Sequence, residues 1–170
     1  MKKFLRRVLL ILLVLALILS VRALASPRLG FLHGLRYGMG PVTTGLFLGL
    51  PTEVDNRLLE YQELWCDYET QWEGVPTAVS ISWFGGIAID RVSAEADAGD
   101  RESAEALFAD WSAQIRAALG NREGFYCGEI RRDADAKASL NLGTNRGATG
   151  ISCTVELDGT VVCVSCNRSF

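Results

Sequence analysis

The sequence predicts an α+β domain, in which an antiparallel sheet of about five strands is packed by two amphipathic helices behind an apolar leader helix. Three observations lead to this fold class. Two segments, 53–73 and 101–119, space their apolar residues as one face of a helix. Two other segments alternate apolar and polar residues on either side of glycine turns, and the first 25 residues place cations before an apolar run.

Residues 1–25 have the anatomy of a secretory leader. Four cations, Lys2, Lys3, Arg6 and Arg7, precede an apolar run over residues 8–19, which ends near the small-x-small pattern Ala23-Leu24-Ala25. We expect cleavage after Ala25 and a periplasmic or secreted domain. The alternative is a retained single-pass anchor, spanning through residues 4–25, with the domain held outside the cytoplasm at an inner membrane.

Composition favours one acidic domain after the leader. The 170-residue chain has net charge −3, and its first 25 residues carry five cations and no acid, so their removal leaves about −8. Such a charge disfavours binding to nucleic acid and to anionic lipid. We expect a single domain over residues 53–170, and the bias toward Arg, Ala and Gly is typical of bacterial proteins.

Residues 26–52 form a glycine-rich lead segment, in which glycines recur four residues apart. We interpret it as a flexible lead-in, and the alternative is a small-residue stripe of the kind that lets membrane helices pair. These glycines are Gly30, Gly34, Gly38, Gly45 and Gly49.

The first predicted helix of the domain covers residues 53–73, with Thr52 as its N-cap. Its apolar positions recur at intervals of 4, 3, 4, 3 and 4 residues, from Val54 to Trp72. Aromatic residues at this spacing usually pack into a core, but they could also form a binding platform. The candidate interaction surface is therefore the stripe Tyr61, Trp65, Tyr68 and Trp72.

The segments that follow predict sheet, helix and sheet. Residues 79–89 indicate a hairpin that turns at Gly85-Gly86, and residues 93–100 an acidic loop that lacks the EF-hand ligand order. A helix is expected over 101–119, a short strand over 125–130 and a polar loop over 132–149. Residues 151–166 predict a final hairpin around Asp158-Gly159.

Five cysteines follow the leader, and an oxidising compartment favours disulfides between them. A two-residue turn at Asp158-Gly159 would make Cys153 and Cys166 diagonal neighbours, whereas a three-residue turn would place Cys153 opposite Cys163. We favour the second register. Cys66 and Cys127 then form the second pair, and Cys166 remains as a possible free thiol.

Neither a redox nor a metal role is favoured for these cysteines. The pair Cys163 and Cys166 has CxxC spacing but no helix after it to lower a thiol pKa, and a four-thiolate zinc site would normally show two such pairs. We therefore expect no metal and no cofactor.

No catalytic residue can be assigned from the sequence. His33 is the only histidine, and the chain has no nucleophile elbow, P-loop or dinucleotide fingerprint. The leading hypothesis is an exported bacterial envelope protein that binds a protein partner without catalysis. The alternatives are a single-pass accessory subunit of a membrane complex and a small periplasmic hydrolase that uses carboxylates among Asp67, Glu69, Glu73 and Asp90.

Overall fold

The computed structural model describes residues 2–25, 35–119, 125–133, 137–144 and 150–169 of the chain. The element order is α1 (Lys2–Ala25), α2 (Pro41–Leu48), β1 (Glu53–Arg57), β2 (Glu63–Trp72), β3 (Val75–Phe84), β4 (Ala88–Asp97) and α3 (Arg101–Leu119), followed by β5 (Phe125–Cys127), β6 (Arg131–Arg132), β7 (Ala138–Thr144), β8 (Gly150–Asp158) and β9 (Val161–Ser169). His33 lies outside the described residues.

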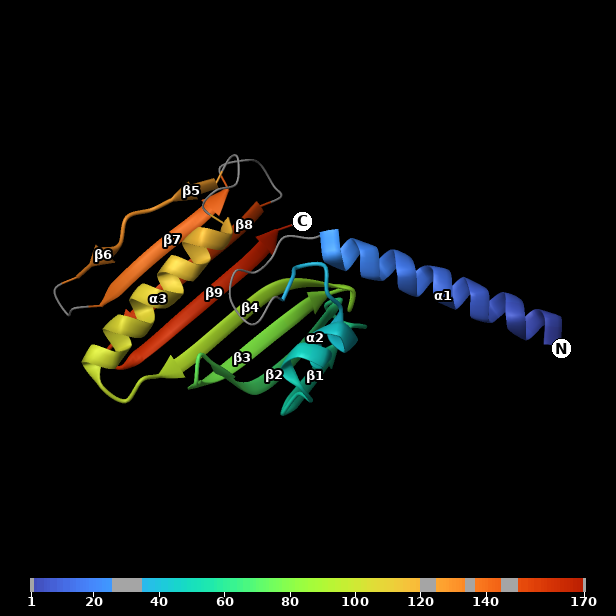
Figure 1. Ribbon diagram of the computed structural model, residues 1–170, viewed down its shortest axis with the longest axis horizontal. Coiled ribbons are helices and arrows are strands. Elements are labelled where there is room, and N and C mark those ends of the chain that lie inside the picture. The colour runs from blue at the N-terminus through green and yellow to red at the C-terminus, as the bar shows by residue number, and fades with distance from the viewer. Residues whose placement is uncertain (1, 26–34, 120–124, 134–136, 145–149, 170) are drawn as a thin grey trace.

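All the strands belong to one antiparallel sheet of nine strands (Figure 1). Its order is β1-β2-β3-β4-β9-β8-β7-β5, and β6 pairs with β7 beside β5. The five-stranded sheet packed by two amphipathic helices, predicted from the sequence, is therefore wrong. The structure is mostly sheet with three helices, and only α3 matches a helix predicted for the domain.

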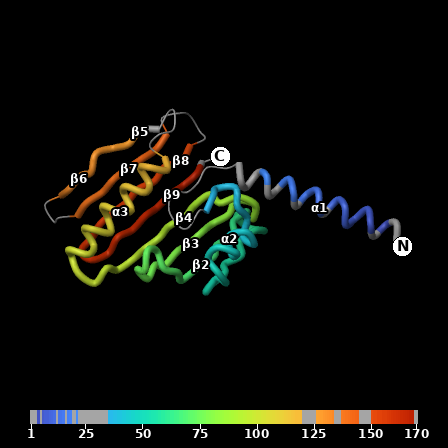
Figure 2. The backbone as a smooth tube through the Cα atoms, viewed as in Figure 1, coloured from blue at the N-terminus to red at the C-terminus, as the bar shows by residue number. Residues whose placement is uncertain are grey.

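The chain builds this sheet from two similar halves. In each half a helix precedes a series of antiparallel strands, α2 before β1–β4 and α3 before β5–β9. The last strand of each half, β4 and β9, pair with each other at the centre from Arg91 opposite Asn167 to Asp97 opposite Val161. The junction between the halves is therefore a full strand ladder, and the tube in Figure 2 shows the sheet running without a break across it.

The predicted helix over residues 53–73 is two strands instead. Val54 pairs with Cys66 across β1 and β2, and Trp72 pairs with Val75 across β2 and β3. The spacing misled because Tyr68 and Trp72 are four residues apart, which suits one face of a helix and also one face of a strand. Glu73 and Gly74, with φ of 53° and 85°, form the two-residue turn after β2.

The other corrections concern segments expected to be irregular. Ala138–Thr144, in the predicted loop, forms β7, an inner strand that pairs with β8 on one side and with β5 and β6 on the other. Residues 93–97 of the predicted acidic loop complete β4. In the glycine-rich lead segment, Leu35 and Tyr37 are buried and Pro41–Leu48 is helical, so the described part of that segment belongs to the domain.

The core lies between one face of the sheet and the helices α2 and α3 (Figure 1). Trp72 of β2 stacks on Trp111 of α3 with ring centroids 4.1 Å apart, which places α3 against the first half as well as its own. The indole of Trp83 donates to the carbonyl of Met39 at 3.1 Å, so the segment before α2 covers the same face. Burial of these large side chains supplies the main stabilisation of the domain.

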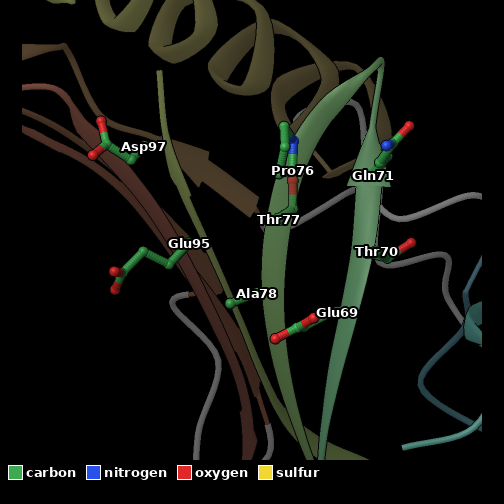
Figure 3. A pocket seen from close by; sticks show the side chains of 8 residues that line it. All are labelled: Glu69, Thr70, Gln71, Pro76, Thr77, Ala78, Glu95 and Asp97. Carbon is green, nitrogen blue, oxygen red and sulfur yellow. The ribbon is translucent and has the colours of Figure 1, made fainter. Parts of the chain in front are cut away.

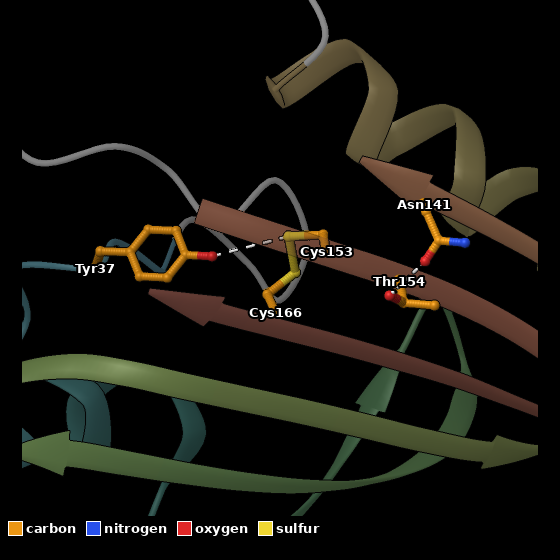
Figure 4. Close-up of a disulfide and its surroundings, with 5 residues drawn as sticks. All are labelled: Tyr37, Asn141, Cys153, Thr154 and Cys166. Atoms are coloured by element: carbon orange, nitrogen blue, oxygen red, sulfur yellow. Dashed lines mark hydrogen bonds between the residues drawn. A yellow bond between two sulfur atoms is a disulfide. The ribbon is translucent and has the colours of Figure 1, made fainter. Parts of the chain in front are cut away.

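A disulfide joins Cys153 of β8 to Cys166 of β9 inside this core (Figure 4). Asp158 pairs with Val161, so the turn residues are Gly159 and Thr160, and only Gly159 has a positive φ. Compared with the predicted two-residue turn at Asp158-Gly159, this turn lies one residue further along the chain, which moves every cross-strand partner by two residues; compared with the favoured three-residue turn, the partner of Cys153 moves by three, from Cys163 to Cys166. As a result Cys166, expected to be free, lies opposite Cys153, while Cys66, Cys127 and Cys163 are free thiols.

Helix α1 projects away from the sheet along the long axis of the molecule (Figure 1). Its described large apolar side chains, from Phe4 to Val21, are exposed. Within the described residues, no helix combines the length and the apolarity needed to cross a membrane.

Candidate functional site

The candidate site is the open face of the nine-stranded sheet, the face opposite the helices. In each strand alternate residues point away from the core, and the strand register aligns them into rows that run across the sheet. Three such rows can be followed through the paired residues of β2, β3, β4, β9, β8 and β7. We name them the central, acidic and aromatic rows.

From β3 to β7 the central row consists of small hydroxyl and amide side chains, and its member on β2 is the carboxylate of Asp67, opposite Ser80. Ser80 of β3 is opposite Ser93 of β4, which is opposite Ser165 of β9, and the row continues through Thr154 to Asn141. At about 4.8 Å per strand the part of the row from β3 to β7 is about 19 Å long. The Thr154 hydroxyl donates to the Asn141 side-chain carbonyl at 2.9 Å (Figure 4), so these groups also bond within the row.

The acidic row places a glutamate on every second strand. Glu69, Glu95 and Glu156 lie on β2, β4 and β8, and Ala78 and Cys163 occupy the strands between them. Figure 3 shows Glu69 and Glu95 pointing to the same side of the sheet as Asp97. These residues border an open hollow of about 580 Å³. The row therefore gives one side of the open face a negative potential.

The negative potential and the partial burial of Cys163 both change the pKa of its thiol. Burial and the neighbouring Glu95, whose carboxylate lies 3.6 Å from the sulfur, raise the pKa of Cys163 to about 11. Both effects disfavour the thiolate, because one removes water from the charge and the other repels it. Cys163 is therefore held as a neutral thiol, a poor nucleophile and a poor metal ligand.

The aromatic row is centred on Trp65. Its indole N–H donates to Glu63 Oε2 at 3.0 Å, and the Arg91 guanidinium lies 5.3 Å from the ring centroid. Trp65 is half-buried, and the row continues through Ser82 and Arg91 to Asn167 and Ser152. The cation on one side and the hydrogen bond at the edge fix the ring as a rigid contact surface.

The predicted aromatic stripe is divided between the two faces of the sheet. Tyr68 and Trp72 point into the core and are only 2% exposed, so they cannot contact a partner. Burial raises the pKa of the Tyr68 hydroxyl, with a smaller contribution from Cys66. Trp65 lies on the open face, and Tyr61, 58% exposed, lies in the loop before β2. The structure therefore keeps half of the predicted surface available.

The four carboxylates considered for hydrolysis are not gathered in one cleft. Glu73 is in the turn after β2 and accepts a hydrogen bond from Gln114 of α3 at 2.9 Å. Asp90 accepts from Ser82, which is paired with Trp65, eight residues from Glu73 along β2. Eight residues of strand span about 26 Å, whereas glycosidase carboxyl groups lie about 5 to 9.5 Å apart. Glu73 and Asp90 therefore cannot act as such a pair.

The residues that sequence reasoning missed are the serines and threonine of the central row. They come from strands far apart in the sequence, and only the register aligns them. In the last hairpin, polar residues at Ser152, Thr154, Ser165 and Asn167 alternate with apolar residues. This pattern does indicate that one face of the hairpin is solvent-exposed. Within the described residues, no group of three histidine, cysteine or acidic side chains could hold a metal ion.

Comparisons with known proteins give no family for this chain. No protein-family model matches it, and neither curated protein sequences nor solved structures include a match.

Proposed function

We propose that the chain is an exported envelope protein whose domain binds a protein partner through the open face of its sheet, without catalysis of its own. The observation that carries the proposal is this face: six neighbouring strands present an ordered, polar surface that none of the described helices covers. This face is broad and open, and such a surface suits another macromolecule better than a small molecule, which is normally enclosed.

The charges on the face indicate what the partner presents. Glu69, Glu95 and Glu156 align along one side, so a partner with a basic surface would be complementary and would associate faster at low salt. Trp65, fixed beside Arg91, supplies the kind of aromatic contact that carries much of the binding energy in protein interfaces.

Export is supported by the leader pattern and by the apolar side chains exposed around α1. A helix that is apolar on all sides is suited to an export channel or a lipid phase and not to water. In the leading form of the proposal the leader is cleaved after Ala25. N-terminal sequencing of the protein that accumulates in the envelope tests this directly, because cleavage gives Ser26 as the first residue, and retention supports the single-pass alternative.

Partner binding is tested by blocking the centre of the open face. The double substitution Ser93→Arg and Ser165→Arg places two large cations on adjacent strands of the central row. We expect it to reduce recovery of the partner, captured by crosslinking and affinity purification from envelope fractions, by tenfold or more. The matched control is Ala113→Arg, an exposed site on α3 on the other side of the molecule.

Two results would contradict the proposal. Equal recovery of the same partner by the double variant and by Ala113→Arg would show that the open face is not the binding surface. If the unmodified protein recovers no stoichiometric partner at either low or physiological salt, the proposed binding function is wrong. Circular dichroism of both variants establishes that each has kept its fold.

A further inference from the structure

Exposed apolar side chains of the domain are concentrated at one end of it. Beyond α1, eleven large apolar side chains are exposed in the described chain, and nine of them lie between residues 42 and 87. Soluble domains normally scatter such residues, and a contiguous patch marks a contact with a partner or a membrane. The nine residues, which we name the apolar end, are Val42, Leu46, Phe47, Leu50, Val54, Leu59, Tyr61, Phe84 and Ile87.

Backbone contacts bring the segments of the apolar end together. The amide of Gly85, in the β3–β4 turn, donates to the carbonyl of Gln62 in the loop before β2 at 2.6 Å. The backbone at Gly40, which precedes α2, approaches the carbonyl of Ile87 so closely that an added Cβ would lie 3.5 Å from it. The turn after β3 thus joins the Leu59–Tyr61 loop on one side to the start of α2 on the other.

The segment that contains α2 and its flanking residues, which forms part of the apolar end, carries no charged side chain. Residues 37–52 contain no Asp, Glu, Lys or Arg, although such residues make up 22% of the chain. Within this stretch, Val42, Leu46 and Leu50 are 82–91% exposed. A neutral apolar surface of this kind avoids the repulsion that the acidic remainder of the domain would meet at anionic lipid.

We propose that the apolar end inserts into the headgroup and acyl boundary of a lipid bilayer, with α2 lying on the membrane surface. The proposal rests on the export proposal, because α1 brings this end to the membrane, before cleavage in the leading form and permanently in the single-pass form. Only residues 26–34 separate α1 from Leu35, and about ten peptide units extend at most ~36 Å. While α1 is attached and engaged, α2 cannot be far from the lipid.

Lipid accounts for the shape of this surface better than a second copy of the chain. Leu59 is 105% exposed and Leu50 91% exposed, so each protrudes from the end of a separate segment. Protein interfaces bury their anchors in complementary pockets and enrich arginine among them. Protruding leucines on separate segments instead suit a fluid phase that closes around each of them.

Photocrosslinking in cells tests the proposal on the full chain. A diazirine-bearing amino acid at Leu46, and separately at Leu50, is expected to give lipid adducts after irradiation, detected by mass spectrometry of the purified protein. The control carries the same group at Ile130, which is 39% exposed and lies between β5 and β6 in the second half of the domain. We expect at least tenfold more lipid adduct at Leu46 than at Ile130.

Each other outcome overturns the membrane contact. Crosslinks from Leu46 to another copy of the chain would assign the apolar end to a dimer interface, and crosslinks to a different protein would assign it to a partner. Equal lipid labelling at Leu46 and Ile130 would leave no specific contact. An alkaline phosphatase fusion at the C-terminus reports export separately: an active fusion without lipid adducts overturns only the membrane contact, and an inactive fusion overturns the export proposal.

Discussion

The three free cysteines differ in the environment that the fold gives each thiol. Cys127 is exposed, Cys66 is buried, and Cys163 is partly buried beside Glu95. Burial, the largest cause, raises the pKa of Cys66, and the pKa of Cys163 is about 11. At pH 8 only about one Cys163 side chain in a thousand is a thiolate, so its reaction with alkylating agents is slow.

Alkylation followed by intact mass measurement therefore has an expected pattern. The native protein at pH 8 should gain one adduct rapidly, at Cys127, and the unfolded protein should gain three without reductant. Reduction should bring the number to five, because it opens the bond between Cys153 and Cys166. The variant Cys127→Ser should lose the rapid adduct, and five adducts without reductant would contradict the disulfide.

Glu105 connects α3 to the short strand β6. Its carboxylate accepts two hydrogen bonds from Arg132, at 2.8 and 2.7 Å, and one from Arg101 at 2.8 Å. These partners, Arg132 first, lower the pKa of Glu105 to about 2 from its ordinary value of 4.5. Because the folded pKa is lowered, the stabilisation is complete above about pH 4.5 and is lost as the pH falls through about 2.

Glu105→Gln should therefore destabilise the protein in a pH-dependent way. We expect a loss of about 1 kcal/mol in the free energy of unfolding at pH 6.5, a modest value because the side chain is 32% exposed. Near pH 2 the difference from the unmodified protein should be close to zero. Urea denaturation at both pH values measures it, and an equal loss at both would contradict the ionic role of Glu105.

Among the elements, α3 is the one on which the packing of both halves depends. It packs on β7, β8 and β9 of its own half, and through Trp111 it reaches Trp72 of the first half. Trp111 is fully buried, so its removal opens a large cavity that neighbouring side chains cannot fill.

Trp111→Ala should lower the free energy of unfolding by about 3 to 5 kcal/mol. Chemical denaturation followed by far-UV circular dichroism measures the change. Ala113→Ser, at an exposed position of the same helix, should change stability by less than about 0.5 kcal/mol. A loss for Trp111→Ala as small as that of this control would show that the contact between the tryptophans does not hold the halves together.

At the scale of the whole molecule, the two halves share one sheet and one core. The β4–β9 ladder joins them in the sheet, and Val92 and Ala94 of β4 share the core with Val164 and Cys166 of β9. Neither half can bury its inner face without the other, so the domain should unfold as a unit.

Urea unfolding should accordingly show a single transition. Tryptophan fluorescence reports mainly on the first half, since Trp65, Trp72 and Trp83 lie there, whereas far-UV circular dichroism reports on all the strands and α3. We expect the two probes to give coincident curves. Two separated midpoints would show that the halves unfold independently and that the central ladder is weaker than its length indicates.

The sequence by itself predicted the features that depend on nearby residues. The helix over 101–119 matches α3, because the apolar stripe from Ala104 to Leu119 and the following Gly120 are local signals. The hairpins around Gly85-Gly86 and Gly159 are present, because the glycines adopt positive φ there.

The tertiary structure decided what depends on distant residues. The four-residue interval between Tyr68 and Trp72 satisfies both helical and strand spacing, and pairing of β2 with β3 determines which one forms. The position of the β8–β9 turn, at Gly159 and Thr160, selected Cys166 as the partner of Cys153, because a shift in register changes every cross-strand pair. The rows of the open face follow from the same registers, since only strand pairing aligns Ser80, Ser93 and Ser165.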